Sequence, residues 1–512
     1  MNIKTNPKIR TTNQKGFAFV EAFIILALII SVGLLGNFTL KRIRNNDSQA
    51  ESKSSAVDPK YPGKSHQSTT GNVTYQVNIP FYQHDSNGNK NAFINITSRL
   101  KSVADMGVNV IQLTPVHTSA YLVLDHYDVS WKYTGNTREN QGTKESRIAY
   151  FKNYVNYAHR LKMKVIMDCV YHGTAINSPL VQQHPDWYKR DDKGDLVINR
   201  FGLPQFDTSK EEVRAYIKDV TKYWIEKVGI DGCRADMAHS VPLSFWADLN
   251  NEMKKIKSSW TMVGEAFGTQ AEYAQPYKEG NLKGVYGFDG VYDFYHQSVM
   301  YGIVDQKRKA SEIEAAWNAR PKYHRENFYN MIDDHNITIR SATLSGGNSG
   351  MVAAMAVNFT LDGMPFIFNG QEIGDTTAGG PQIDETRYYS WENPPHPENR
   401  QKFKQLICLR RNNKSLSKAT TVWNKTSDPD GVVSYTRTNG KEKTLVVVNL
   451  SNKKWSGTVN GKFPSSVFDM ITRRNYKTSG KSVRLSLKPY SYFIANASGA
   501  KSSKATALLC SK

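Results

Sequence analysis

The sequence predicts an α/β fold: a (β/α)₈ TIM barrel with a short insertion after its third strand, followed by a C-terminal antiparallel β-sandwich. Between residues 73 and 414, short apolar runs alternate with amphipathic helical stretches. After Leu416 the pattern changes to short segments with a period of two. No G-x-G-x-x-G loop follows an early strand, although an open doubly wound sheet that binds a dinucleotide would need one.

The first 72 residues predict a signal anchor and a linker. The apolar stretch over residues 17–40 reaches the roughly 20 residues of a membrane span only if Glu21 is included. Basic residues flank both ends and no small-x-small cleavage site follows, so we expect an uncleaved anchor over residues 1–44. The alternative is a type IV prepilin leader, which the sequence around Gly16 weakly resembles. Residues 45–72, rich in Ser, Lys, Asn and Gln, predict a flexible linker.

The barrel is expected over residues 73–414, because its apolar segments are short and most of them are followed by a helical stretch. The expected strands are Thr74–Ile79, Val108–Leu113, Lys164–Val170, Gly229–Ala235, Thr261–Glu265, Gly284–Phe288, Asn327–Ile332 and Pro365–Phe368. The expected helices are Ile94–Met106, Ser146–Leu161, Ser209–Val228, Pro242–Lys257, Ser311–Ala319 and Ser349–Leu361.

Two segments depart from this alternation. Residues 172–208 are too long for a common connection and predict a small lobe or active-site loop. Residues 415–497 predict the β-sandwich, and residues 498–512 a disordered tail. The expected sandwich strands are Val432–Arg437, Leu445–Leu450, Lys454–Val459, Ser466–Met470, Val483–Leu487 and Tyr490–Ile494.

The charge of the chain is unevenly distributed. The formal net charge of +21 would suit a nucleic-acid-binding protein. However, residues 65–400 hold 35 basic and 38 acidic residues, whereas residues 401–512 hold 22 basic and 4 acidic residues. We therefore expect no nucleic-acid partner. A basic C-terminal region beside a membrane anchor instead suggests attraction to anionic lipid or a cell-wall polymer.

The chain has 4 cysteines, too few for a disulfide scaffold. Cys169 and Cys233 fall on neighbouring strands and could be close, but a bridge depends on backbone geometry that the sequence does not define. Cys408 is expected in a helix. Cys510 lies in the tail and is the one cysteine expected to be exposed.

Acidic residues stand at the ends of four expected strands. Asp168 ends the third strand, Asp236 follows the fourth and Glu265 ends the fifth. Asp333 and Asp334 end the seventh. One such residue could cap the next helix, but four at the same barrel mouth indicate a carboxylate cluster. Such a cluster suits glycoside hydrolysis by two carboxylates, or equally a divalent metal site.

These segments resemble the alpha-amylase family (glycoside hydrolase family 13) from about Thr74 to Asn496. The matching motifs are YQVNIPFYQHDSNGN from Tyr75, MGVNVIQLTPV from Met106, VIMDCVYHGTA from Val165, GIDGCRADMAH from Gly229, MVGEA from Met262 and GMPFIFNGQEIG from Gly363. The MVGEA motif alone is weak, whereas the ordered set at family-like spacing is a strong signal.

The resemblance implies catalytic roles. Asp236 matches the nucleophile that forms a covalent glycosyl intermediate, and Glu265 matches the general acid/base. Arg234 lies two residues before Asp236, on the same strand face, and would keep it ionised.

Other positions of the motif would bind substrate. Tyr127, in the DHYDV segment, matches the aromatic residue that stacks on the reacting sugar. Asp168 matches an acid that orients the site, and His239 could line the leaving-group side or be structural. Trp187 and Tyr188 could stack on further sugars or pack in the lobe.

Two positions depart from the family pattern. Gly173 replaces the histidine that contacts the reacting sugar. On the seventh strand the family has Asn-His-Asp, and the local match places His335 on the histidine and Asn336 on the third catalytic carboxylate. Asp334 is our choice for that carboxylate, with Asp333 as the alternative. If neither serves, activity should be weak.

We therefore expect a membrane-anchored extracellular glycosidase that cleaves α-glucosidic bonds of starch-like glucans or maltooligosaccharides with retention. Its alternatives are a transglycosylase on the same residues and a non-catalytic glucan-binding protein. No cofactor is required. Calcium is common in the family, and Asp85–Asn89 supplies oxygen side chains at alternate positions, although a plain turn is the favoured interpretation.

Overall fold

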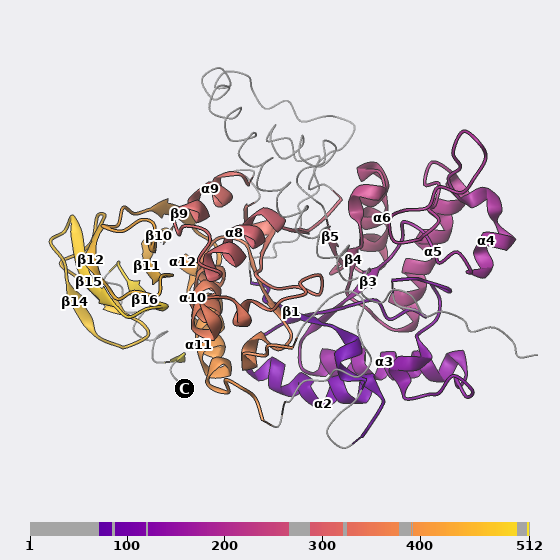
Figure 1. The fold of residues 1–512 in the computed structure, drawn as a ribbon, viewed down its shortest axis with the longest axis horizontal. Helices are drawn as coiled ribbons and strands as arrows, with labels where there is room; N and C mark the ends of the chain where they lie inside the picture. The colour runs from indigo at the N-terminus through magenta and orange to yellow at the C-terminus, as the bar shows by residue number, and fades with distance from the viewer. Residues whose placement is uncertain are drawn as a thin grey trace, which may run out of the picture. The chain divides into compact units, whose positions relative to one another are not determined.

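Eight parallel strands close into a barrel in chain order, with β1 also pairing with β8 (Figure 1). The computed structural model describes residues 71–83, 88–118, 121–265, 287–320, 325–377, 391, 393–498 and 509–510. The barrel strands are β1 (Thr74–Val77), β2 (Val110–Leu113), β3 (Lys164–Cys169), β4 (Gly232–Ala235), β5 (Thr261–Gly264), β6 (Gly290–Tyr292), β7 (Phe328–Asn330) and β8 (Met364–Phe368). The predicted fold class is confirmed.

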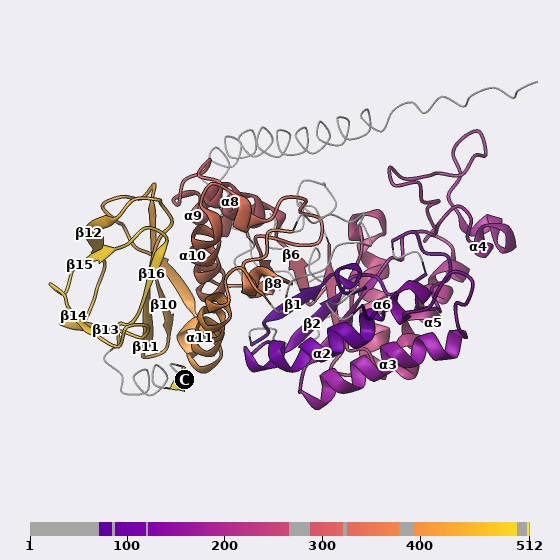
Figure 2. The ribbon, with the colours of Figure 1, turned by 60° about the horizontal axis from the view of Figure 1, so that its bottom comes forward.

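Helices surround this barrel, and α2 and α3 pack against each other (Figures 1 and 2). The helices are α2 (Ala92–Asp105), α3 (Lys144–Arg160), α5 (Glu211–Lys227), α6 (Leu243–Ile256), α8 (Phe294–Val304), α9 (Glu312–Asn318), α10 (Gly347–Thr360), α11 (Glu398–Asn412) and the short α12 (Lys414–Ser417). Four begin at a side chain that accepts a hydrogen bond from a first-turn N–H: Asn91, Thr143, Asp293 and Asn413.

The sixth strand lies later in the chain than predicted. The sequence pattern favoured Gly284–Phe288, of which residues 284–286 lie outside the described residues, whereas β6 spans Gly290–Tyr292. Asp289, just before β6, accepts a hydrogen bond from the Met262 backbone N–H at the neighbouring strand. The prediction was wrong because β6 follows an acidic residue and begins with glycine, so it has no extended apolar run.

The insertion between β3 and α5 is held close to the barrel end. It contains helix α4 (Pro179–Gln183) and isolated bridges, one of which pairs Gly173 with Gln205. A Cβ at Gly173 would lie 2.1 Å from the carbonyl oxygen of Pro204. The close backbone approach therefore requires glycine at this position.

The C-terminal region forms two sheets that share an apolar core. A six-stranded sheet has the order β14–β13–β16–β11–β10–β9, and β12 pairs with β15 in a second sheet. Trp455 and Leu485 of the smaller sheet pack in one core with Val447 and Phe493 of the larger. The strands are β9 (Thr420–Trp423), β10 (Val432–Asn439), β11 (Glu442–Asn449), β12 (Trp455–Asn460), β13 (Ser466–Asp469), β14 (Asn475–Lys477), β15 (Ser482–Leu487) and β16 (Ser491–Asn496).

Polar contacts join this sandwich to α10 and the loop that follows it. The hydroxyl groups of Tyr435 and Thr360 lie 2.6 Å apart. The fully buried Arg437 forms an ion pair with Asp362. Tyr435 and Arg437 belong to β10, and Thr421 of β9 also donates to Asp362, at 2.6 Å.

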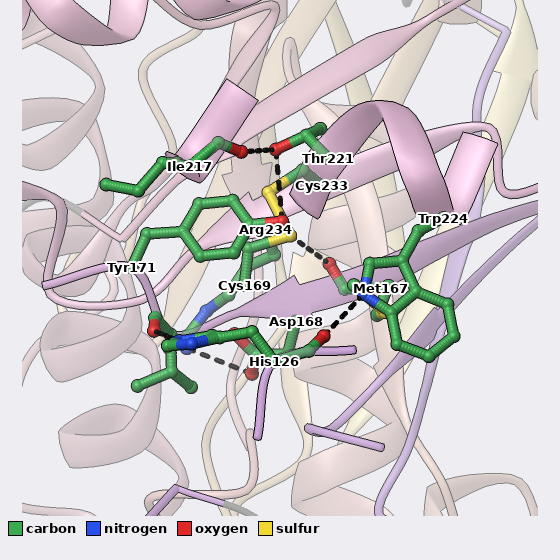
Figure 3. Close-up of a disulfide and its surroundings, with 11 residues drawn as sticks. His126, Met167, Asp168, Cys169, Tyr171, Ile217, Thr221, Trp224, Cys233 and Arg234 are labelled. Atoms are coloured by element: carbon green, nitrogen blue, oxygen red, sulfur yellow. Dashed lines mark hydrogen bonds and ion pairs between the residues drawn. A yellow bond between two sulfur atoms is a disulfide. The ribbon is translucent and has the colours of Figure 1, made fainter. Parts of the chain in front are cut away.

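Two disulfides pair the four cysteines. Cys169 of β3 bonds to Cys233 of β4, with their Cα atoms 5.8 Å apart and their sulfur atoms beside Tyr171 and Thr221 (Figure 3). Cys408 of α11 bonds to Cys510, which is 4% exposed. The expectation that Cys510 is exposed was wrong, because the bond to α11 buries it.

Among the described residues, none of the helices combines the length and apolar character needed to cross a bilayer. The expected anchor over residues 1–44, with its prepilin-like alternative, lies outside the described residues, as does the predicted linker up to residue 70.

Both disulfides should be present in the folded protein. Protein denatured without reductant should therefore contain no free thiol, whereas reduction should release four. The replacement Cys408→Ala/Cys510→Ala should lower the free energy of unfolding by about 2–4 kcal/mol, because it opens a long loop. Thiol titration and urea unfolding measure the two effects. Two or more free thiols in the unreduced protein would contradict the assignment.

Candidate active site

The acidic residues predicted at the strand ends meet at one end of the barrel. Asp168 belongs to β3, Asp236 follows β4 and Glu265 follows β5. Because neighbouring parallel strands end at the same edge, their side chains reach a common site. The strand register pairs Asp168 directly with Arg234 of β4. All four residues are buried.

Arg234 contacts all three carboxylates. Its Nη1 donates to Asp168 Oδ1 at 2.8 Å and to Asp236 Oδ1 at 2.6 Å. Its Nη2 lies 2.5 Å from Glu265 Oε1, an ion-pair contact. The guanidinium also lies over the ring of Tyr292, 5.4 Å from the ring centre. The planar fork of arginine allows one cation to serve several carboxylates, which a lysine could not do in this geometry.

Asp236 is held as a carboxylate. His172 Nε2 lies 2.9 Å from Asp236 Oδ2, and a carboxylate can only accept, so this nitrogen carries a proton. Burial acts to raise the pKa of Asp236, but Arg234 and His172 outweigh it and hold the pKa below its ordinary value. The side chain is therefore ionised and available at neutral pH.

Glu265 has the opposite tendency. Burial raises the pKa of Glu265 to about 8, against the positive charge of Arg234 and with added repulsion from Asp236. Its Oε2 accepts the backbone N–H of Met237 at 2.9 Å. Met237 has a φ of 43°, in the left-handed region that costs a non-glycine residue about 1–3 kcal/mol. That strained turn directs the N–H towards Glu265.

The residues after β7 take three different positions. Asp333 accepts hydrogen bonds from the Ser341 N–H and hydroxyl and from Gln371, so it is engaged away from Glu265. Asn336 donates from Nδ2 to Glu265 Oε1 at 3.3 Å and to Asp334 Oδ2 at 3.2 Å. The amide thus faces Glu265, and the Asp334 carboxylate lies behind it. Burial raises the pKa of Asp334.

His335 forms one wall of the site with Tyr121. The two rings stack with centres 5.6 Å apart and planes 6° apart, and the Tyr121 hydroxyl donates to Asp168 Oδ2 at 2.9 Å. Gln76 of β1 accepts the backbone N–H of His335 and lies 2.9 Å from its Nδ1. Burial and the charge of Arg234 lower the pKa of His335 well below its ordinary value, so the ring is neutral.

Tyr127 does not lie in this cluster. It packs edge-on against Tyr216 and Tyr223 of α5, and the ammonium of Lys144 lies over its ring. The aromatic ring at the carboxylates is that of Tyr121, six residues earlier. The placement expected for Tyr127 was therefore wrong, because the loop after β2 folds Tyr121 inwards and leaves Tyr127 against the helix layer.

The remaining candidate residues come from the turn after β4 (His239) and from the insertion (Trp187 and Tyr188). His239 is half-buried, and burial with the nearby charges of His172 and Arg200 lowers its pKa. Trp187 stacks on His184 with ring centres 3.9 Å apart. Tyr188 is 2% exposed, and its hydroxyl lies 2.8 Å from that of Thr174. Tyr188 therefore packs inside the lobe and is not free to stack on a sugar.

The departure at Gly173 has a steric explanation. The insertion backbone occupies the space that any side chain at residue 173 would need. The histidine of this segment is instead His172, one residue earlier, and its ring reaches Asp236.

No group of three or more His, Cys, Asp or Glu side chains within the described residues is arranged to hold a metal. The proposed calcium loop lies partly outside them, at residues 84–87. Asn89, at its end, accepts a hydrogen bond from the Asn91 N–H, as in a turn before α2.

The sequence pattern did not identify Tyr121, His172 or Gln76 as site residues. His172 had a detectable signal, since it follows the strand-end Asp168 by four residues. Tyr121 had a weaker one, an aromatic residue in the loop after β2. Gln76 had none, because its role depends on the pairing of β1 with β8 that closes the barrel.

The arrangement combines an ionised carboxylate with a protonated one. Asp236 can attack an electrophilic carbon, and Glu265 can give a proton to a leaving group and later take one from water. A pair of carboxyl groups with pKa values displaced in opposite directions is the pattern of a nucleophile and a general acid.

Comparison with known proteins agrees with this geometry. Residues 182–444 match the family described as alpha amylase, catalytic domain, and residues 425–494 match the maltogenic amylase C-terminal domain. A cyclomaltodextrinase of Geobacillus thermopakistaniensis is 23% identical over 78% of this chain and 69% of its own. An intracellular maltogenic amylase of Bacillus subtilis is 25% identical over 70% of this chain and 61% of its own. The chain thus spans about two thirds of the length of these relatives.

Solved structures share the fold. An alpha-amylase of Anoxybacillus superposes with a TM-score of 0.70 at 21% identity, covering 85% of this chain and 99% of its own. A noncanonic maltogenic alpha-amylase of Thermotoga neapolitana superposes with a TM-score of 0.69 at 20% identity, covering 85% of this chain and 100% of its own.

Proposed function

The chain belongs to the alpha-amylase family of glycosidases, and we propose that it cleaves α-glucosidic bonds of starch-like glucans or maltooligosaccharides by a retaining double displacement. One observation carries this proposal. Asp236 and Glu265 are held by the same Arg234, yet the pKa of Asp236 is lowered and that of Glu265 is raised. A retaining glycosidase needs this division between nucleophile and acid.

In the first step, an oxygen of Asp236 attacks C1 of the glucosyl unit. The C1–O bond to the leaving sugar breaks, and Glu265 transfers its proton to the leaving oxygen. The products are a covalent glycosyl ester on Asp236 and a leaving sugar with a free hydroxyl group. Arg234 and His172 keep the nucleophile ionised until the bond forms.

In the second step, water attacks C1 from the side that the leaving sugar vacated. Glu265, now a carboxylate, accepts a proton from that water, and the ester bond to Asp236 breaks. Both carboxyl groups return to their starting states. Two inversions at C1 give net retention of the anomeric configuration.

The third acidic position is occupied by an amide. Asn336 donates to Glu265, and its Nδ2 also bonds the Asp334 carboxylate. Relative to the Asn-His-Asp order of the family, this chain has Asp-His-Asn, so the acid and amide have exchanged places. The carboxylate stands two residues earlier, behind the amide, where it stabilises developing positive charge less well, and such a loss costs about 3–4 kcal/mol. We expect a slow enzyme.

Transglycosylation uses the same residues and differs only in the acceptor of the second step. Longer oligosaccharides among the products would indicate transfer, and reducing sugar alone would indicate hydrolysis. The amide at Asn336 is the observation that favours a non-catalytic glucan-binding protein. Binding of maltotriose without cleavage over long incubation would support that alternative.

We place the catalytic part outside the cell membrane, held by the expected anchor. The two disulfides support an oxidising compartment, where structural disulfides persist. The Bacillus subtilis relative is, by its name, intracellular. Acid quenching of intact cells followed by alkylation of the denatured protein tests this location, because a reducing compartment would leave the buried cysteines as free thiols that the reagent then labels.

The proposed activity has a direct test. Full-length protein should release reducing sugar from starch, pullulan, maltotriose or a cyclomaltodextrin, and Glu265→Gln should lower kcat by about 10²–10⁴-fold because proton transfer is lost. Glu226→Gln, on the exposed face of α5, is the matched control and should keep full activity. No turnover on any of these substrates, or equal turnover by Glu265→Gln, would refute the proposal.

The exchange of acid and amide predicts a gain of function. The double variant Asp334→Asn/Asn336→Asp keeps the charge and composition of the site while moving the carboxylate next to Glu265. It should raise kcat/KM about 100-fold, as expected for recovering about 3 kcal/mol of transition-state stabilisation. Asn336→Asp alone is the control, and it should gain less because it adds a second buried carboxylate. A double variant slower than the native enzyme would show that Asp334 already serves as the third catalytic carboxylate from its native position.

The two displaced pKa values predict the pH dependence of kcat/KM. Activity requires protonated Glu265, so it should fall as pH rises through about 8. Activity also requires ionised Asp236, whose pKa is lowered, so the acidic limb should lie below pH 4. His172→Ala should move the acidic limb to higher pH while leaving the alkaline limb in place. An alkaline limb below pH 6 would contradict the role of Glu265.

A further inference from the structure

The outer face and the ends of the β12–β15 sheet carry a group of exposed cations, which we call the cationic stripe. Its six members are exposed and form no ion pair with another described residue. They are Lys453, Lys454, Lys462, Lys481, Arg484 and Lys488. After Glu442 the one acidic residue in the chain is Asp469, and it is 2% exposed and bonded to Thr472.

The strand register sets the geometry of the stripe. Val483, Leu485 and Leu487 point into the sandwich core, so the alternate residues of β15, including Arg484, point outwards. The last printed pair at one end is Trp455 with Leu487, and continuing this register by one residue brings Lys454 opposite Lys488. At the other end, the Gly461 N–H donates to the Lys481 carbonyl, next to Lys462. Six residues of strand give a stripe about 20 Å long.

Like charges opposite each other destabilise a sheet. Lys454 faces Lys488, and nothing acidic within the described part of the sandwich offsets this repulsion. This repulsion lowers the stability of the sheet, and no protein group among the described residues compensates it. Such an arrangement fits a surface whose positive charge is neutralised by a bound anionic ligand.

The surroundings of the stripe restrict the kind of ligand. Between residues 432 and 498, all of them described, no large apolar or aromatic side chain is strongly exposed, so the face offers neither an anchor for a bilayer nor a ring for base stacking. The side chains between the cations are small and hydroxylated or amidic: Ser456, Thr458, Asn460, Ser482 and Ser486. These groups can bond phosphate oxygens and polyol hydroxyls.

We propose that the cationic stripe binds a linear phosphodiester polymer of polyol units, which positions the enzyme on an anionic polymer. Strands β12 and β15 lie on the side of the sandwich away from α10 and α11 (Figures 1 and 2), and the stripe shares no residue with the carboxylate cluster. Binding is therefore independent of catalysis, so the binding test can succeed or fail whatever the glycosidase assay shows.

The test measures binding of full-length protein to poly(glycerol phosphate) over a series of salt concentrations. About six phosphate contacts predict a slope of log affinity against log salt of about −4. Lys454→Glu/Lys488→Glu should weaken binding at least tenfold and reduce the slope to about −3. Lys152→Glu/Lys404→Glu, with the same change in net charge on exposed positions of α3 and α11, should change binding less than threefold.

Each other outcome overturns the proposal. No binding by the native protein at about 50 mM salt, or equal weakening by the two double variants, would show that the stripe is an ordinary solvated face. A larger effect of Lys454→Glu/Lys488→Glu on vesicles of anionic lipid, or on duplex DNA, than on the polymer would assign the stripe to that partner instead.

A stability measurement separates function from folding. Lys488→Glu alone converts the repulsive pair with Lys454 into an attractive one, so it should raise the unfolding temperature while weakening polymer binding. Hydrolysis of maltotriose should remain at the native level. A lower unfolding temperature would show that the two cations do not oppose each other, and it would remove the argument from repulsion.

Discussion

The structure of the site depends on the buried guanidinium of Arg234. One buried cation contacts three buried carboxylates, and a low-dielectric interior does not tolerate two uncompensated negative charges. A proton must therefore remain on the cluster. His172 adds a donor to Asp236, whereas Glu265 receives neutral donors from Met237 and Asn336. The proton consequently resides more readily on Glu265, and the same constraint that balances charge also assigns acid and nucleophile.

The insertion and the end of β7 show how neighbouring residues adjust to that constraint. Gly173 lies against the backbone at Pro204, so a histidine side chain has no room there, and His172 supplies the imidazole to Asp236 instead. After β7, an amide rather than a third acid faces Glu265, and the Asp334 carboxylate accepts a hydrogen bond from that amide. The first change leaves an imidazole donor on Asp236, and the second leaves an amide donor on Glu265. They fit a site in which ionisation of Asp236 is secured at some loss of transition-state stabilisation.

Charge is divided between the two ends of the folded chain in a way that suits two tasks. The barrel is nearly neutral and concentrates its charge in a buried cluster, where each interaction is strong because solvent is excluded. The sandwich carries exposed cations without exposed acids over β12 to β15, where single interactions are weak and act together along a polymer. The net charge of +21 therefore reflects mainly the surface of the C-terminal region. It does not reflect the chemistry of the carboxylate cluster at the end of the barrel.

The sequence by itself determined the barrel, the sandwich and the identities of Arg234, Asp236 and Glu265, because strand periodicity and strand-end acids are local patterns. It did not locate β6, which lacks an apolar run, or choose Tyr121 over Tyr127, which depends on how a loop folds back. The order of Asp333, Asp334 and Asn336 around Glu265, the burial of Cys510 and the Cys169–Cys233 bond were likewise decided only by the tertiary structure. Each of these depends on distances between segments far apart in the chain, and a linear pattern of residues does not contain such distances.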